Sequence, residues 1–128
     1  TLAEPFAKLI NGVHINADAV RKNYNDWDFS VEGRIRQAQR MRHLADGVVL
    51  SGKVAVADFV CPTEETRKEF GPDYTVWMDT ITASEYKDTN VLFENPPNCN
   101  YHISKWFTDT HAQLSEVVAN YMDRYNVR

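Results

Sequence analysis

The sequence predicts an α/β domain in which helices flank a parallel sheet. Three observations lead to this prediction: predicted strands alternate with predicted helices, the strands are almost continuously apolar, and the 128 residues suit a single domain. Strands that lack a polar–apolar alternation are typical of a sheet with both faces covered. We therefore expect residues 1–128 to form one domain.

The N-terminal part alternates helix, strand and helix. Apolar side chains in residues 1–10 recur at helical spacing, so the sequence opens inside a helix that Asn11-Gly12 ends. Residues 13–15, "VHI", then predict a short buried strand. Residues 17–24, "ADAVRKNY", predict a short helix.

A long helix is predicted after the loop that residues 25–29 form. Ser30 suits its N-cap. Gly47 costs about 1 kcal/mol relative to alanine inside a helix, but we place the helix end at Gly52, because a C-cap glycine there leads into the apolar strand 53–60. The helix carries one apolar stripe, which consists of Ile35, Ala38, Met41, Ala45 and Val48.

The rest of the chain continues this alternation. Pro62 ends the strand before it. The predicted elements are then a helix at 63–70, a strand at 74–79, a polar loop at 80–100, a strand at 101–104, and a helix at 108–125 capped by Thr108 or Asp109.

Composition excludes several classes of protein. With 14 basic and 18 acidic residues the net charge is −4, so we expect no nucleic-acid polymer as a partner. No apolar run reaches the roughly 20 residues that span a bilayer, so we expect no membrane partner. Cys61 and Cys99 form no disulfide framework, and free thiols indicate a cytoplasmic protein. The sequence leaves a homodimer open.

Polar residues follow three predicted strands. Asp18 and Arg21 come just after the first, residues 58–62 end the second, and Asp79 ends the third. Ligands of parallel α/β sheets bind beyond the carboxyl ends of the strands, so these residues predict a site. Asp18 and Arg21 either pair with each other, or Arg21 binds an anion while Asp18 binds a hydroxyl or a metal-bound water.

Four arginines crowd the predicted long helix. Arg34 and Arg42 share one face, Arg36 and Arg40 share another, and only one pair can face a pocket. We expect the others to form a solvated face. Phe29, beside them, either packs on the core or stacks on a flat base that is attached to an anion. The four histidines and two cysteines lack the spacing of a zinc site, and Cys61 suits a buried structural thiol.

Four motifs in this order resemble the adenylylsulfate kinase family of P-loop kinases. The motifs are "INADAVR" at 15–21, "FSVEGR" at 29–34, "VCPTEETR" at 60–67 and "VWMDT" at 76–80. The resemblance implies a three-layer α/β/α P-loop kinase fold. It also implies transfer of phosphate from ATP, with Mg²⁺, to the 3′-hydroxyl of adenosine 5′-phosphosulfate (APS), a small-molecule nucleotide.

The match is incomplete within the motifs. The family's Leu-Asp-Gly-Asp-x-x-Arg keeps Asp18 and Arg21 here, but Asn16 and Ala17 replace its first Asp and its Gly. Its Phe-Ser-x-x-Asp-Arg keeps all but the Asp, which is Gly33. Its Ile-Ser-Pro-Tyr becomes Val-Cys-Pro-Thr at 60–63, and a later family arginine matches at position 67.

The resemblance also implies roles for individual residues. Asp18 would be catalytic, orienting or deprotonating the attacking hydroxyl or holding Mg²⁺ through water. Phe29 would stack on the adenine, and Arg21 and Arg34 would hold the phosphosulfate. Thr1 would contact ATP. The complete substrate-binding set is Arg21, Phe29, Arg34, Gln37, Val60, Cys61 and Pro62.

Two family features have no counterpart in these residues. "TASEYKDTNVLFENPPNCN" stands in place of the family's basic lid, and no G-x-x-x-x-G-K-[ST] loop occurs. We expect the natural polypeptide to carry about 10–15 further residues before Thr1, with a buried strand and that loop. Two other functions stay open: a kinase for another small anionic hydroxyl compound, and a catalytically silent nucleotide-binding module.

Overall fold

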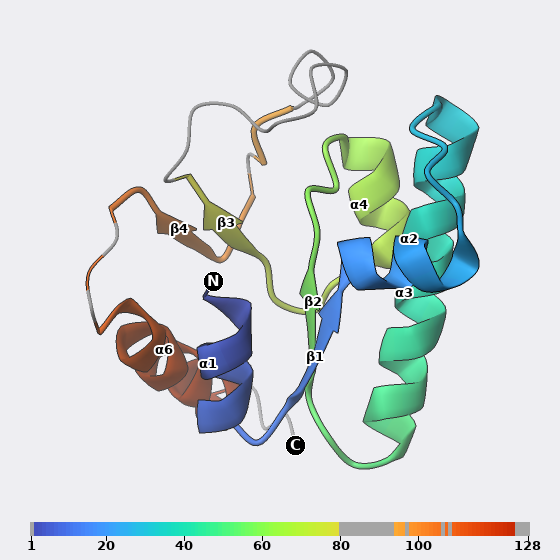
Figure 1. The fold of residues 1–128 in the computed structure, drawn as a ribbon. Coiled ribbons are helices and arrows are strands. Elements are labelled where there is room, and N and C mark those ends of the chain that lie inside the picture. Colours follow the sequence, from blue (N-terminus) through green and yellow to red (C-terminus); the bar gives the residue numbers. More distant parts are fainter. Residues whose placement is uncertain (1, 80–93, 97, 106, 108, 125–128) are drawn as a thin grey trace.

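Helices and strands alternate along the chain as the sequence predicts (Figure 1). The computed structural model describes residues 2–79, 94–96, 98–105, 107 and 109–124. Its elements are α1 (Ala3–Leu9), β1 (Val13–Asn16), α2 (Ala17–Tyr24), α3 (Val31–Leu50), β2 (Ala55–Asp58), α4 (Glu64–Phe70), β3 (Val76–Met78), β4 (Tyr101–Ile103) and α6 (Thr110–Arg124). Most of the predicted loop at 80–100, and Thr108 as a cap, lie outside the described residues.

The strands pair in parallel, as predicted, but in two separate pairs. β1 pairs with β2, with Asn16 opposite Asp58, and β3 pairs with β4. Within the described part of the chain no ladder joins β2 to β3, so the sheet is smaller than predicted. Among the described strands each has one paired neighbour, and β2 is half-buried along its length instead of fully covered.

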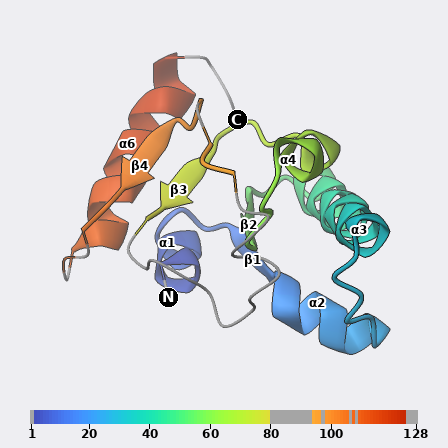
Figure 2. The same cartoon turned by 90° about the horizontal axis from the view of Figure 1, so that it is seen from above.

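Helices cover both sides of the β1–β2 pair. α1 and α6 lie on one side and α3 and α4 on the other, which gives three layers (Figure 1; Figure 2). The first core cluster joins α1, β4 and α6 through Leu2, Phe6, Ile103, Leu114 and Val118. The second joins β1, α2 and α3 through Ile15, Ala17, Val20, Met41 and Ala45. Both clusters lie between layers and fix the strand ends relative to the helices.

The long helix α3 begins and ends where the sequence predicts. Its N-cap is Ser30, whose Oγ accepts a hydrogen bond from the backbone N of Gly33 at 3.1 Å. Gly47 lies inside the helix, and Gly52 follows its end with a φ of 86°, which glycine adopts without strain. None of the helices in the described ranges is both long and apolar enough to cross a bilayer.

Candidate functional site

A pocket lies beyond the carboxyl ends of β1 and β2, where the sequence predicts a site. All eight predicted residues other than Thr1 line it, together with three that sequence reasoning missed. Its lining consists of Ala17, Asp18, Arg21, Phe29, Arg34, Gln37, Phe59, Val60, Cys61, Pro62 and Thr66. Thr1 lies outside the described residues, and Asp79 is not in the lining.

The pocket is assembled from two consecutive strand ends. Ala17 and Asp18 follow β1 directly, and residues 59–62 follow β2. Ala17 and Phe59 could have been found from the sequence, because Ala17 lies two residues after the predicted strand 13–15 and Phe59 lies near the end of the predicted strand 53–60. Thr66 lies in the first turn of α4, where it forms a capping box with Thr63, and its side chain is buried. Its place in the pocket wall is visible only in the folded structure.

Arg21 is buried and anchored by the loop that follows α2. Its Nη1 donates hydrogen bonds to the backbone oxygens of Asp26, at 3.0 Å, and Asp28, at 3.3 Å. Burial lowers its pKa, yet an arginine stays charged at neutral pH. No ion pair joins Arg21 to Asp18, so this alternative from the sequence is not realised. The result is a positive charge held by backbone carbonyls at the pocket wall.

The ring of Phe29 contacts both arginines of the pocket. The guanidinium carbon of Arg21 is 4.5 Å from the centre of its ring, and that of Arg34 is 5.2 Å away. The Nε of Arg34 also donates to the backbone oxygen of Phe29 at 2.8 Å. Both arginines are almost completely buried, at 5% and 7% exposure. An aromatic ring beside two guanidiniums suits a flat base that carries an anionic group.

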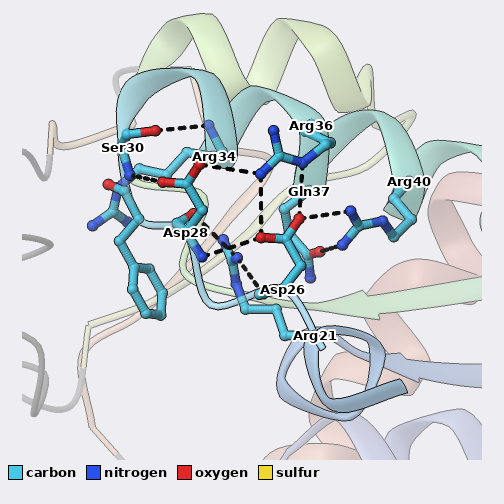
Figure 3. Close-up of polar contacts among 10 residues, drawn as sticks. Arg21, Asp26, Asp28, Ser30, Arg34, Arg36, Gln37 and Arg40 are labelled. Carbon is cyan, nitrogen blue, oxygen red and sulfur yellow. Dashed lines mark hydrogen bonds and ion pairs between the residues drawn. The ribbon is translucent and has the colours of Figure 1, made fainter. Parts of the chain in front are cut away.

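The predicted solvated face of arginines is confirmed for Arg36, whose side chain is 46% exposed, and is wrong for Arg40, whose side chain is 13% exposed. Arg36 binds the carboxylate of Asp26 through Nε at 2.8 Å and that of Asp28 through Nη2 at 3.1 Å (Figure 3). Arg40 binds Asp26 at 2.8 Å and also the Oε1 of Gln37 at 2.9 Å. These bonds tie the 25–30 loop to α3, and they hold the pKa of Asp26 far below its usual range.

Arg42 does not accompany Arg34 into the pocket, although the two were expected on one face. Its Nη1 donates to the backbone oxygens of Phe70 at 2.9 Å and Gly71 at 2.7 Å, and its Nε pairs with Asp46 at 3.0 Å. Arg42 therefore joins the end of α4 to α3. Of the four helix arginines, Arg34 is the one in the pocket lining, and the other three bind acids or backbone oxygens outside the pocket.

The opposite wall of the pocket is held by Arg67. Its Nε donates to the backbone oxygen of Cys61 at 3.0 Å, and its Nη2 to that of Pro62 at 3.3 Å. Cys61 has a φ of 45°, a backbone conformation that is costly for a residue other than glycine. Burial raises the pKa of its thiol. Neither Cys61 nor Cys99 is in a disulfide, as predicted.

Two more side chains in this region already have protein partners. Gln37 donates from Nε2 to the backbone oxygen of Ala17 at 3.0 Å. Asn16, which stands where the family motif has an Asp, accepts from the backbone N of Ala19 at 3.0 Å and donates to Asp58 at 3.2 Å. Asn16 therefore caps α2 and bridges to β2.

Asp18 differs from its neighbours, because it is exposed at the pocket and makes no hydrogen bond or ion pair to any described residue. Its carboxylate is thus available to a ligand. Among the residues with described positions, no group of three His, Cys, Asp or Glu side chains could hold a metal. Mg²⁺ usually takes only one or two carboxylates and completes its shell with water and phosphate oxygens. A single carboxylate at this position fits that chemistry.

Comparison with known proteins gives one family and one fold. A family model described as "Adenylylsulphate kinase" matches residues 5–98. No curated protein matches the sequence. A structure of the Mycobacterium tuberculosis APS kinase CysC in complex with AMPPNP and APS is similar, with a TM-score of 0.74 and 14% identity. That match covers 95% of this chain and 88% of the other, and at this identity it shows a shared fold.

Proposed function

The chain belongs to the adenylylsulfate kinase family, and on this premise we propose that it phosphorylates the 3′-hydroxyl of adenosine 5′-phosphosulfate with ATP. The observation that carries the proposal is one pocket in which an aromatic ring lies against two buried guanidiniums. A ring and two positive charges match the adenine and the phosphosulfate of that acceptor.

In this proposal the acceptor is held at both ends. Phe29 stacks on the adenine, and Arg21 and Arg34 bind the phosphosulfate oxygens. Arg21 is suited to this role because its bonds to loop carbonyls fix its position without neutralising its charge. Both amide ends of Gln37 have protein partners, so we assign it to shaping the wall between the two arginines. The backbone at Val60, Cys61 and Pro62 closes the other side.

Asp18 is the proposed catalytic residue. Its carboxylate makes no hydrogen bond or ion pair with a described residue, and it can accept a hydrogen bond from the attacking hydroxyl and orient it. The same carboxylate would hold Mg²⁺, directly or through water, and the ion would neutralise charge on the phosphates. In phosphoryl transfer the protein mainly positions groups, so the fixed placement of Arg21 and Arg34 supplies much of what the site needs.

A catalytically silent nucleotide-binding module is the second candidate. Asn16 favours it, since this side chain occupies a motif position of an aspartate and is used to cap α2. Such a module would keep the pocket for the nucleotide and lack transfer. A kinase for a different small anionic hydroxyl compound would keep the two arginines but need no stacking on Phe29.

Turnover of ATP across a panel of acceptors separates these functions. With the full natural polypeptide we would measure ADP release with Mg²⁺ and APS, with AMP, and with non-nucleotide hydroxyl compounds that carry a phosphate or sulfate. Release that depends on APS alone supports the proposal, and release with a non-nucleotide acceptor favours the other kinase. Binding of APS by calorimetry without any ADP release supports the silent module. If neither APS binding nor ADP release is observed, all three functions are refuted.

A further inference from the structure

The space beside Gly33 is already filled by another residue. A Cβ atom built on Gly33 would lie 2.2 Å from the backbone oxygen of Asp28 and 2.5 Å from its carboxyl carbon, closer than any real contact. Position 33 is where the family motif Phe-Ser-x-x-Asp-Arg has its aspartate. In this chain the carboxylate that approaches the first turn of α3 therefore comes from the loop, at position 28.

Asp28 connects the loop to the start of α3 with its carboxylate. Its Oδ1 accepts from the backbone N of Ser30 at 2.9 Å, and its Oδ2 from Arg36 at 3.1 Å (Figure 3). Ser30 is the N-cap of α3, so Asp28 fixes the residue with which the helix begins. The hydrogen bonds to the carboxylate also lower the pKa of Asp28, so that it stays ionised near neutral pH.

The backbone of Asp28 reaches the pocket. Its oxygen accepts from the Nη1 of Arg21 at 3.3 Å, and its N donates to Asp26 at 3.1 Å. Phe29 is the next residue. A change in the position of Asp28 therefore moves the carbonyl that holds one pocket arginine and the ring on which both pocket arginines lie.

We propose that Asp28 is a positioning residue for the acceptor pocket, whose carboxylate takes over in space the place of the motif's aspartate at position 33. It acts through Ser30 and Arg36 on the loop, and through the loop on Arg21 and Phe29. This inference rests on the proposed function for the identity of the ligand, but not for the geometry. It also accounts for the glycine at position 33, because a Cβ there would meet both the backbone oxygen and the carboxyl carbon of Asp28.

Replacement of Asp28 tests the proposal. Asp28→Gly removes the carboxylate, and the expected result is about 10-fold weaker binding of APS by calorimetry, the scale of one lost bond to a charged group. Asp28→Asn keeps an oxygen that can accept from the backbone N of Ser30, and its affinity for APS should stay within about 3-fold of the unchanged protein. An Asp28→Gly variant that binds APS as tightly as the unchanged protein overturns the proposal.

Amide hydrogen exchange at Ser30 gives a second readout that needs no ligand. Asp28→Gly removes the acceptor of the Ser30 N–H, so this amide should exchange at least about 10-fold faster. Asp28→Asn keeps an oxygen at that position and should leave the amide protected. Asp46→Asn, an exposed acid-to-amide change on α3, is the control for Asp28→Asn and should change neither readout. If the unchanged protein does not bind APS, the proposed function fails; unchanged exchange in Asp28→Gly refutes the positioning role itself.

Discussion

Replacing Phe29 with alanine separates a stacking platform from a core residue. Base–aromatic stacking is worth about 1–3 kcal/mol. In the structure, however, the ring already has Arg21 at 4.5 Å and Arg34 at 5.2 Å, and a base that takes one face displaces a cation–π contact of about 0.5–1 kcal/mol. Subtracting the middle of the second range from the middle of the first gives a net loss of about 1.25 kcal/mol, or roughly 8-fold in Kd.

The assay is calorimetric titration of APS into the unchanged protein, Phe29→Ala and Trp27→Ala. Trp27 belongs to the same loop, is 46% exposed and does not line the pocket, so its replacement should change affinity by less than about 2-fold. The affinity for inorganic phosphate should be the same in all three. A fall in the free energy of unfolding without a fall in APS affinity would refute the stacking role and assign Phe29 to the fold alone.

Three further changes test the other groups of the site. Asp18→Asn should leave APS affinity nearly unchanged but lower kcat by about 100-fold or more, and a full rate would reduce Asp18 to a residue of the first turn of α2. Arg34→Ala should weaken APS binding by about 1.5–3 kcal/mol, whereas Arg42→Ala on the same helix should not, and equal affinities would contradict the assignment. Asp26→Asn should flatten the acid dependence of stability. Since the pKa of Asp26 is lowered on folding, its contribution is complete above about pH 4 and is lost as the pH falls below that value. Melting temperatures between pH 6 and pH 2.5 that fall in parallel for both proteins would refute this.

Local signals in the sequence account for most of the elements. Ser30 caps α3 and Gly52 follows its end, as predicted, because both signals act through the backbone of neighbouring residues. The pocket was predictable for a related reason. Parallel strands place their carboxyl ends at one edge, so residues after β1 and β2 meet without any knowledge of packing. The resemblance to the family then selected Phe29, Arg34 and Gln37 from the next elements.

Partners that are far apart in the sequence were not predictable. Arg36 and Arg40 face acids in the loop 10 and 14 residues before them, and a charge pattern on a helix does not show which distant group lies opposite. The separation into two strand pairs is equally non-local, since it depends on which edges meet after folding. The relation of Asp28 to Gly33 is a matter of filled volume, which no spacing rule reports.

The most direct test of the central claim is an equilibrium titration with APS, AMP and inorganic sulfate, carried out on the unchanged protein and on Arg34→Ala and Phe29→Ala. If the pocket binds both the base and the anion, APS should bind tightest, Arg34→Ala should lower its affinity by about 10-fold or more, and Phe29→Ala should weaken APS and AMP alike. APS binding no tighter than sulfate, or unaffected by both replacements, would contradict an acceptor pocket for adenosine 5′-phosphosulfate.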